Sequence, residues 1–278
     1  MQKTIGVRDK LNTFPRGKAA SPYRARPAPA LYMACALCLC GCLWSTTLGF
    51  ATENESTPPR TAVVQGMTQE EAADGFQPMF NGRNLEGWEG KPDWHVEDGA
   101  ITCESTEEKP CVKHHYLYWR GAQPGDFILR ARFKIVGGNS GIQFRSEERP
   151  DYDIWGYQAD IEDGTEWMGC LFQHDRGAVV LRGFAARIAP DGAREEQRLA
   201  DPHALLGVVR HHDWNEYEII AVGPTVELKI NGTTMCRVED RDAKFSRRSG
   251  HIALQMHPGP PMKVQFKDLR IKILDKTP

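Results

Sequence analysis

The stretch VGGNSGIQFRSEERPDYDIWGYQADIED, residues 136–163, predicts two short strands joined by a loop. Side chains of a strand alternate between its two faces, so each strand divides into two series. The apolar series are Ser140, Ile142 and Phe144, then Tyr157, Ala159 and Ile161. The polar series are Asn139, Gly141, Gln143 and Arg145, then Gln158, Asp160 and Glu162. The pattern predicts that one face packs in a core and the other is polar.

The polar face is rich in side chains that fix hydrogen-bond geometry. Amides and carboxylates offer directed donors and acceptors, and arginine binds planar oxygen groups with two parallel hydrogen bonds. This composition suits a surface that binds a polyhydroxylated ligand through directed hydrogen bonds. The alternative is an ordinary solvated strand face with a chance arginine–aspartate pair.

Composition excludes one class of partner. The chain has 278 residues and a formal net charge of −2. Because the chain has no excess of positive charge to bind phosphates, a nucleic-acid partner is not expected.

The first 51 residues predict a targeting segment. A basic, proline-rich region is followed by an uncharged apolar run over residues 30–51, as in a secretory signal peptide. Export to the periplasm or the extracellular space is the first expectation. A lipoprotein signal at Leu39-Cys40-Gly41-Cys42 and an uncleaved membrane anchor are the alternatives, so membrane contact is expected only through this segment. Residues 52–75 predict a flexible linker with one helical turn at 68–73.

Residues 76–275 predict a single all-β domain. Short strands alternate with turns such as Asp98-Gly99 and Asn231-Gly232, without a convincing amphipathic helix. Strands are expected at 127–135, 177–185, 216–222, 225–230, 234–238, 251–256 and 264–273. About a dozen strands of this length make a two-sheet sandwich. Four cysteines fall in this domain, with no CxxC pair, and Cys103 and Cys111 are placed to bridge across a loop.

Several short motifs occur in a fixed order along this domain. They are Phe80-Asn81-Gly82, Gly87-Trp88, NSGIQFR at 139–145, GYQADI at 156–161, Trp214-Asn215, GHIALQ at 250–255 and FKDL at 266–269. The set resembles the 3-keto-disaccharide hydrolase family, formerly a domain of unknown function, and covers about residues 75–274. The resemblance implies a jelly-roll sandwich of concanavalin-like or laminin-G-like type, with a concave sheet facing a small carbohydrate. It also implies an enzyme that cleaves 3-keto-glycosides.

The chemistry of such a substrate indicates catalytic residues on the polar face. A ketone at carbon 3 acidifies the hydrogen on carbon 2, so a base can remove it and the glycosidic oxygen can leave carbon 1. Asp160 is the first candidate base and His174 the second, and Arg145 is expected to hold the enolate oxygen. Substrate binding is assigned to Asn139, Gln143, Trp155, Gln158, Gln255 and His257.

Two departures from the family pattern keep a second function open. The family more often has Gly-Tyr-Glu-x-Gln where this chain has GYQAD at 156–160, and an acidic pair where this chain has Gln173-His174. A non-catalytic glycan-binding module is therefore the alternative. Asp160, Asp163, Glu166 and His174 offer atoms to a divalent metal, but their spacing does not support one, so the cofactor is left unknown.

Overall fold

The computed structural model describes residues 63–64 and 66–274, and this part of the chain is almost entirely β-structure. The expected leader at 1–51 and most of the expected linker lie outside the described residues. No helix within the described part is long and apolar enough to cross a membrane.

One sheet of the described chain has seven antiparallel strands in the spatial order β12-β11-β10-β9-β18-β7-β4. In that order they are Gly177–Val180, Leu171–Gln173, Asp153–Glu162, Asn139–Arg149, His251–Met256, His115–Trp119 and Trp88–Glu89. The predicted pair of strands within residues 136–163 is thus β9 and β10, near the middle of this sheet.

The other large sheet of the described chain has ten strands in the order β14-β13-β17-β16-β15-β8-β19-β6-β5, with β3 paired to β19. In that order they are Arg194–Arg198, Phe184–Ile188, Thr233–Asp240, Thr225–Ile230, Asn215–Val222, Phe127–Val136, Met262–Ile273, Ala100–Ser105 and His95–Glu97, and β3 is Gln77–Pro78. Only the β13–β17 pairing in this sheet of the described chain is parallel. The strand expected at 177–185 is divided into β12 and β13, which belong to different sheets.

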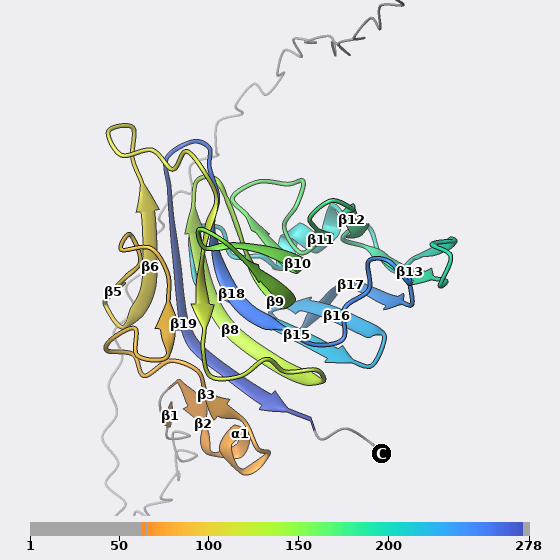
Figure 1. Cartoon of the computed structure of the whole chain (residues 1–278), viewed down its shortest axis with the longest axis horizontal. Helices are drawn as coiled ribbons and strands as arrows, with labels where there is room; N and C mark the ends of the chain where they lie inside the picture. The colour runs from red at the N-terminus through yellow and green to blue at the C-terminus, as the bar shows by residue number, and fades with distance from the viewer. Residues whose placement is uncertain (1–62, 65, 275–278) are drawn as a thin grey trace, which may run out of the picture. The chain divides into compact units, whose positions relative to one another are not determined.

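The two sheets pack face to face and enclose one apolar core (Figure 1). Buried residues alternate along β8, as the sequence pattern predicts. The rings of Phe127 on β8 and Phe144 on β9 meet edge to face with centroids 6.0 Å apart. This contact across the sandwich joins the inner faces of both sheets, so the predicted all-β jelly-roll sandwich is confirmed.

The helix α1 (Gln69–Ala73) precedes the sandwich and is tied to it by charge. Thr68 caps the helix and forms a capping box with Glu71. Glu71 Oε1 accepts hydrogen bonds from Arg130 Nη1 at 2.9 Å and Arg270 Nε at 2.8 Å. Residues 66–75 are therefore part of the folded unit, and the expectation of a flexible linker is wrong for them. The helical turn expected at 68–73 is present.

Three further short elements lie outside the two large sheets. Strands β1 (Val63–Val64) and β2 (Met67–Thr68) pair with each other just before α1. The 3₁₀ helix η1 (Ala204–Val208) leads into the loop before β15.

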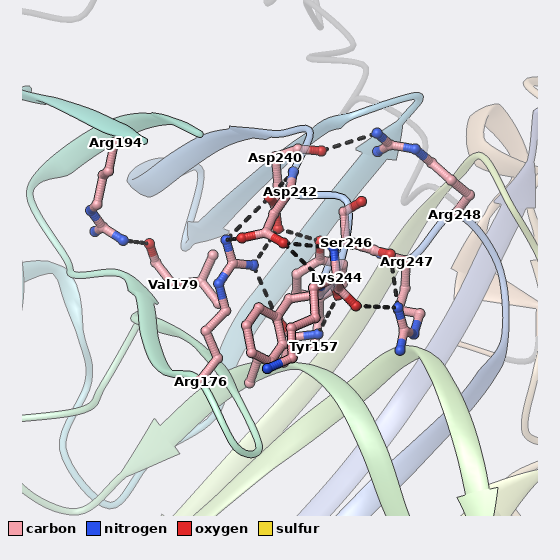
Figure 2. Close-up of polar contacts among 12 residues, drawn as sticks. Tyr157, Arg176, Val179, Arg194, Asp240, Asp242, Lys244, Ser246, Arg247 and Arg248 are labelled. Atoms are coloured by element: carbon pink, nitrogen blue, oxygen red, sulfur yellow. Dashed lines mark hydrogen bonds and ion pairs between the residues drawn. The ribbon is translucent and has the colours of Figure 1, made fainter. Parts of the chain in front are cut away.

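A buried ionic cluster of Tyr157, Arg176, Asp240 and Asp242, the Asp240 cluster, links the two sheets (Figure 2). Asp240 ends β17, and its Oδ2 accepts from the Tyr157 hydroxyl on β10 and from Arg176 Nη1, each at 2.6 Å. Arg176 also lies 3.5 Å from Asp242. Although burial raises the pKa of Asp240, its hydrogen bonds from Arg176 and Tyr157 outweigh burial and lower it.

The four cysteines of the described chain, Cys103, Cys111, Cys170 and Cys236, are free thiols. The bridge considered between Cys103 and Cys111 is not formed. Burial raises the pKa of Cys103 to about 12, so this thiol behaves as a small apolar side chain.

Candidate active site

A cleft of about 610 Å³ lies on the face of the seven-stranded sheet that is turned away from the core. The polar series of β10 forms part of its wall, with Gln158, Asp160 and Glu162. The same strand sends Tyr157, Ala159 and Ile161 into the core, so the predicted division of β10 into two faces is observed. The other lining residues are His114, Gly138, Asn139, Asp163, Trp167, Phe172, His174, Gln255, His257, Pro258 and Pro260.

A chain of hydrogen bonds runs under the cleft across four strands, β10, β9, β18 and β7. Gln143 Nε2 on β9 donates to Gln158 Oε1 on β10 at 2.8 Å. Gln158 Nε2 donates to Asp160 Oδ1 at 2.7 Å and to Gln255 Oε1 on β18 at 3.1 Å. Gln255 Nε2 in turn donates to the Tyr116 hydroxyl at 2.9 Å. Each amide fixes the orientation of the next, so the wall of the cleft is preorganised.

Asp160 carries the most perturbed carboxyl of the cleft. It is 3% exposed, and burial raises its pKa well above the ordinary value. The hydrogen bond from Gln158 opposes this shift only in part. Among the described residues that line the cleft, none is lysine or arginine. Since no cationic side chain lines the cleft to stabilise its anion, Asp160 has the pKa direction expected of a general base working near neutrality.

Three histidines from separate segments meet the same cleft. His174 follows β11, and its Nε2 lies 3.3 Å from the Tyr116 hydroxyl. Its ring centroid lies 5.7 Å from that of His114. Burial lowers the pKa of His174, which favours the neutral imidazole.

His257 has a tautomer that its surroundings define. Its Nδ1 lies 2.6 Å from the carbonyl oxygen of Pro258, which can only accept a hydrogen bond. The proton is therefore assigned to Nδ1, which leaves Nε2 with a free lone pair. Burial also lowers the pKa of His257, so Nε2 is suited to accept a hydrogen bond from a ligand hydroxyl.

Arg145 lies away from the cleft, and the expectation that it holds an enolate oxygen is wrong. The β9–β10 register shifts between Trp155 and Tyr157, which places two β9 residues opposite Gly156, and Arg145 has a φ of 47°. A bulge of this kind turns the side chain from its alternating position. Arg145 is 1% exposed, and its guanidinium donates to the carbonyl oxygens of Gly125 and Gly223 and to Asp126 Oδ1.

Trp155 is also displaced from the site predicted for it. It precedes the bulge and does not line the cleft, and Arg247 stacks 4.0 Å above its ring. Gln143 lies under the cleft and supports Gln158. The remaining predicted residues, Asn139, Gln158, Asp160, His174, Gln255 and His257, line one cavity.

Tyr116 and His114 belong to the site but were not among the residues predicted from sequence. Every residue of β7 is buried, so its sequence HYLYW shows no polar alternation that could have marked one face. Trp167 and Phe172 add aromatic surface to the cleft, with ring centroids 5.8 Å apart. An apolar wall opposite directed polar groups suits a sugar ring, which has both kinds of surface.

The fold and the cleft together define a carbohydrate-active β-sandwich protein. A family model described as a 3-keto-alpha-glucoside-1,2-lyase-like domain matches residues 75–272, and the chain belongs to this family. It is a glycoside hydrolase-like enzyme of the 3-keto-disaccharide hydrolase type.

One relative agrees with this assignment, and one solved structure agrees with the fold. The chain is 23% identical over 253 residues to a 3-keto-disaccharide hydrolase of Bacteroides thetaiotaomicron, covering 73% of this chain and 80% of that protein. A crystal structure of a protein from Parabacteroides distasonis, provisionally described as a glycosyl hydrolase, superposes with a TM-score of 0.51 at 20% identity. That match covers 75% of this chain and 98% of the other, and supports the fold.

Proposed function

We propose that the protein cleaves 3-keto-glycosides by removing the proton on carbon 2 and eliminating the glycosidic oxygen from carbon 1. The observation that carries the proposal is the placement of Asp160, a buried carboxyl with a raised pKa on the wall of the cleft. A carboxylate under these conditions is a stronger base than one in water, and a weak carbon acid needs such a base.

Asp160 has the geometry for both halves of the reaction. Its Oδ1 is held by Gln158, whereas Oδ2 makes no hydrogen bond within the described residues and is left to react. In our scheme the carboxylate takes the proton from carbon 2 and passes it to the oxygen that leaves carbon 1. Asp160 then takes a proton from water, hydroxide adds to carbon 1, and the proton returns to carbon 2. The net reaction consumes one water and leaves Asp160 unchanged.

Neutral groups of the cleft are assigned to the substrate oxygens. The Asn139 side-chain amide makes no hydrogen bond within the described residues, so it is available to donate to the ketone oxygen where charge develops. His257 Nε2 accepts from a sugar hydroxyl. His174, with the Tyr116 hydroxyl beside it, contacts the leaving group. These roles replace the one first assigned to Arg145.

Replacing the base tests the proposal most directly. Asp160→Asn keeps the acceptor for Gln158 and removes the basic oxygen, so turnover of 3-keto-trehalose or 3-keto-lactose should fall roughly 10²–10⁴-fold. Wild-type turnover should rise with pH through the raised pKa of Asp160, because only the ionised carboxyl is a base. Free sugar released over time measures both effects.

Asp201→Asn is the matched control, since Asp201 is exposed and lies outside the cleft. In heavy water the product should carry deuterium on carbon 2, because the elimination breaks that bond and direct hydrolysis does not. Hydrogen kept on carbon 2 in the product of an active enzyme would count against the chemistry. A protein that binds but never turns over these sugars would be a glycan-binding module.

We also propose that the enzyme works outside the cytoplasm. The support is the basic and apolar leader in residues 1–51. Cell fractionation of the producing organism, with N-terminal sequencing of the mature chain, tests this.

A further inference from the structure

A second group of chemically active side chains lies where three loops meet at the rim of the cleft. Asp163 follows β10, and His211 and His212 lie in the loop between η1 and β15. His211 Nδ1 lies 3.1 Å from Asp163 Oδ1, and His212 Nε2 lies 2.8 Å from Asp163 Oδ2. The two imidazole rings stack with centroids 3.7 Å apart. One ligand atom from each of the two imidazoles and the carboxylate therefore lies within 4.8 Å of the others.

The spacing of these ligand atoms fits a metal ion. Nitrogen and oxygen ligands lie about 2.1 Å from a Zn²⁺-sized ion, which places neighbouring ligand atoms about 3.0–3.4 Å apart. The two nitrogen–oxygen distances of 3.1 and 2.8 Å are close to this value, and one atom from each residue can be chosen so that all lie within 4.8 Å of one another. Small rotations of the exposed rings complete the geometry.

The surrounding backbone holds the three residues in place. Gly137 N donates to Asp163 Oδ2 at 2.6 Å. The histidine loop is closed by Asn215, whose side chain accepts from Arg210 N and donates to the carbonyl oxygens of Arg210 and Asp213. His212 has a φ of 53°, a conformation that is unfavourable for a non-glycine residue and persists where the surroundings impose it. The cluster is therefore preorganised rather than a chance meeting of surface side chains.

We propose that Asp163, His211 and His212 bind a divalent transition metal ion of borderline softness, such as Zn²⁺ or Co²⁺. Imidazole nitrogens disfavour Ca²⁺ and Mg²⁺, which prefer all-oxygen ligands. Two histidines and one carboxylate leave the other coordination positions open to solvent or ligand. Asp163 also lines the cleft, so the ion would sit beside that cavity, whose described lining has no lysine or arginine. Arg210 lines the smaller hollow that holds all three residues. This inference does not depend on the proposed reaction.

Cobalt binding to the full chain tests the site without any assay of activity. Thiols are first alkylated with iodoacetamide, because cysteines outside the described residues would also bind Co²⁺. Equilibrium dialysis should then give one Co²⁺ per chain, with visible absorption bands from the bound ion. His211→Ala and His212→Ala should each weaken binding at least roughly tenfold, and Asp163→Asn should do so too.

His203→Ala is the matched control, since His203 is an exposed histidine beside η1 and outside the cluster. It should bind Co²⁺ like the wild type. Circular dichroism of each variant confirms that loss of metal is not loss of fold. Absence of Co²⁺ binding in the wild type would reduce the cluster to two histidine–aspartate hydrogen bonds and overturn the proposal. Binding undiminished in the His211→Ala and His212→Ala double variant, but lost in His174→Ala, would overturn it by placing the ion in the cleft.

Discussion

Asp160 and Asp240 are buried to nearly the same degree, with exposed fractions of 3% and 1%, yet their pKa values shift in opposite directions. Asp240 receives two hydrogen bonds from Arg176 and one from the Tyr157 hydroxyl. Asp160 receives one side-chain hydrogen bond, from the neutral amide of Gln158. A cationic partner outweighs the desolvation penalty at Asp240, whereas a neutral partner does not at Asp160.

The difference separates a structural carboxylate from a reactive one. Asp240 stays ionised and holds the two sheets together, since its partners come from both (Figure 2). Asp160 faces a cleft and has one oxygen without a partner within the described residues. In this protein the buried aspartate that we assign to chemistry is the one without a cationic partner. Three substitutions test this comparison, beginning with the largest expected effect on stability.

Removing the cation from the Asp240 cluster should be the most damaging change. Arg176→Leu leaves Asp240 buried without a counter-charge, so the free energy of unfolding should fall by about 3–5 kcal/mol. Urea denaturation at pH 7 measures the loss. Arg187→Leu is the control, because Arg187 is 71% exposed and should change stability by less than about 0.5 kcal/mol. Equal effects of the two variants would mean that the cluster does not hold the sheets together.

Arg145 should behave like Arg176 and not like a residue of the cleft. Arg145→Ala leaves the carbonyl oxygens of Gly125 and Gly223 and one oxygen of Asp126 without its hydrogen bonds. The cost should be about 3 kcal/mol, because the guanidinium that satisfied these acceptors is itself buried. Turnover per folded molecule should be nearly unchanged. A stable but inactive Arg145→Ala protein would return this residue to the active site.

Asp160→Asn should have the smallest effect on stability of the three substitutions. It should raise the free energy of unfolding, whereas the other two lower it. The folded pKa of Asp160 lies above its ordinary value of 3.8, so wild-type stability falls as pH rises from that value through the folded pKa. The loss is at most about 1.4 kcal/mol per pH unit within this window. Asparagine does not ionise, so the variant should be more stable than wild type at pH 8 and nearly equal to it at pH 4. Urea denaturation at both pH values checks this. A variant less stable than wild type at pH 8 would contradict the assignment.

Strand alternation correctly predicted the part of the site that lies on regular strands. On β10 the polar residues Gln158 and Asp160 line the cleft because the pleat is unbroken from Tyr157 onward. The same rule failed at Arg145 because the bulge in β9 interrupts the alternation of side chains between the two faces of the strand. Gly156 was the available signal, since a Cβ there would lie 2.2 Å from Ser146 Oγ. A glycine inside a strand is a recognised mark of a bulge.

Residues that reach the site from fully buried strands or from loops could not be found in this way. Tyr116 lies on β7, where both faces are buried and periodicity carries no information. His211 and His212 meet Asp163 only through the path of the loop before β15. Such long-range contacts depend on the packing of whole elements, which local patterns do not determine.

The attachment of α1 to the last strand has a consequence for how the chain acquires its structure. Glu71 bonds to Arg270 across 199 positions of sequence, and Lys272 bonds to Asp74 across 198. β3 also pairs with β19. α1 and β3 therefore cannot dock on the sandwich before β19 has been synthesised. Contacts of such high order slow folding and prolong the exposure of strand edges until β19 is available to pair.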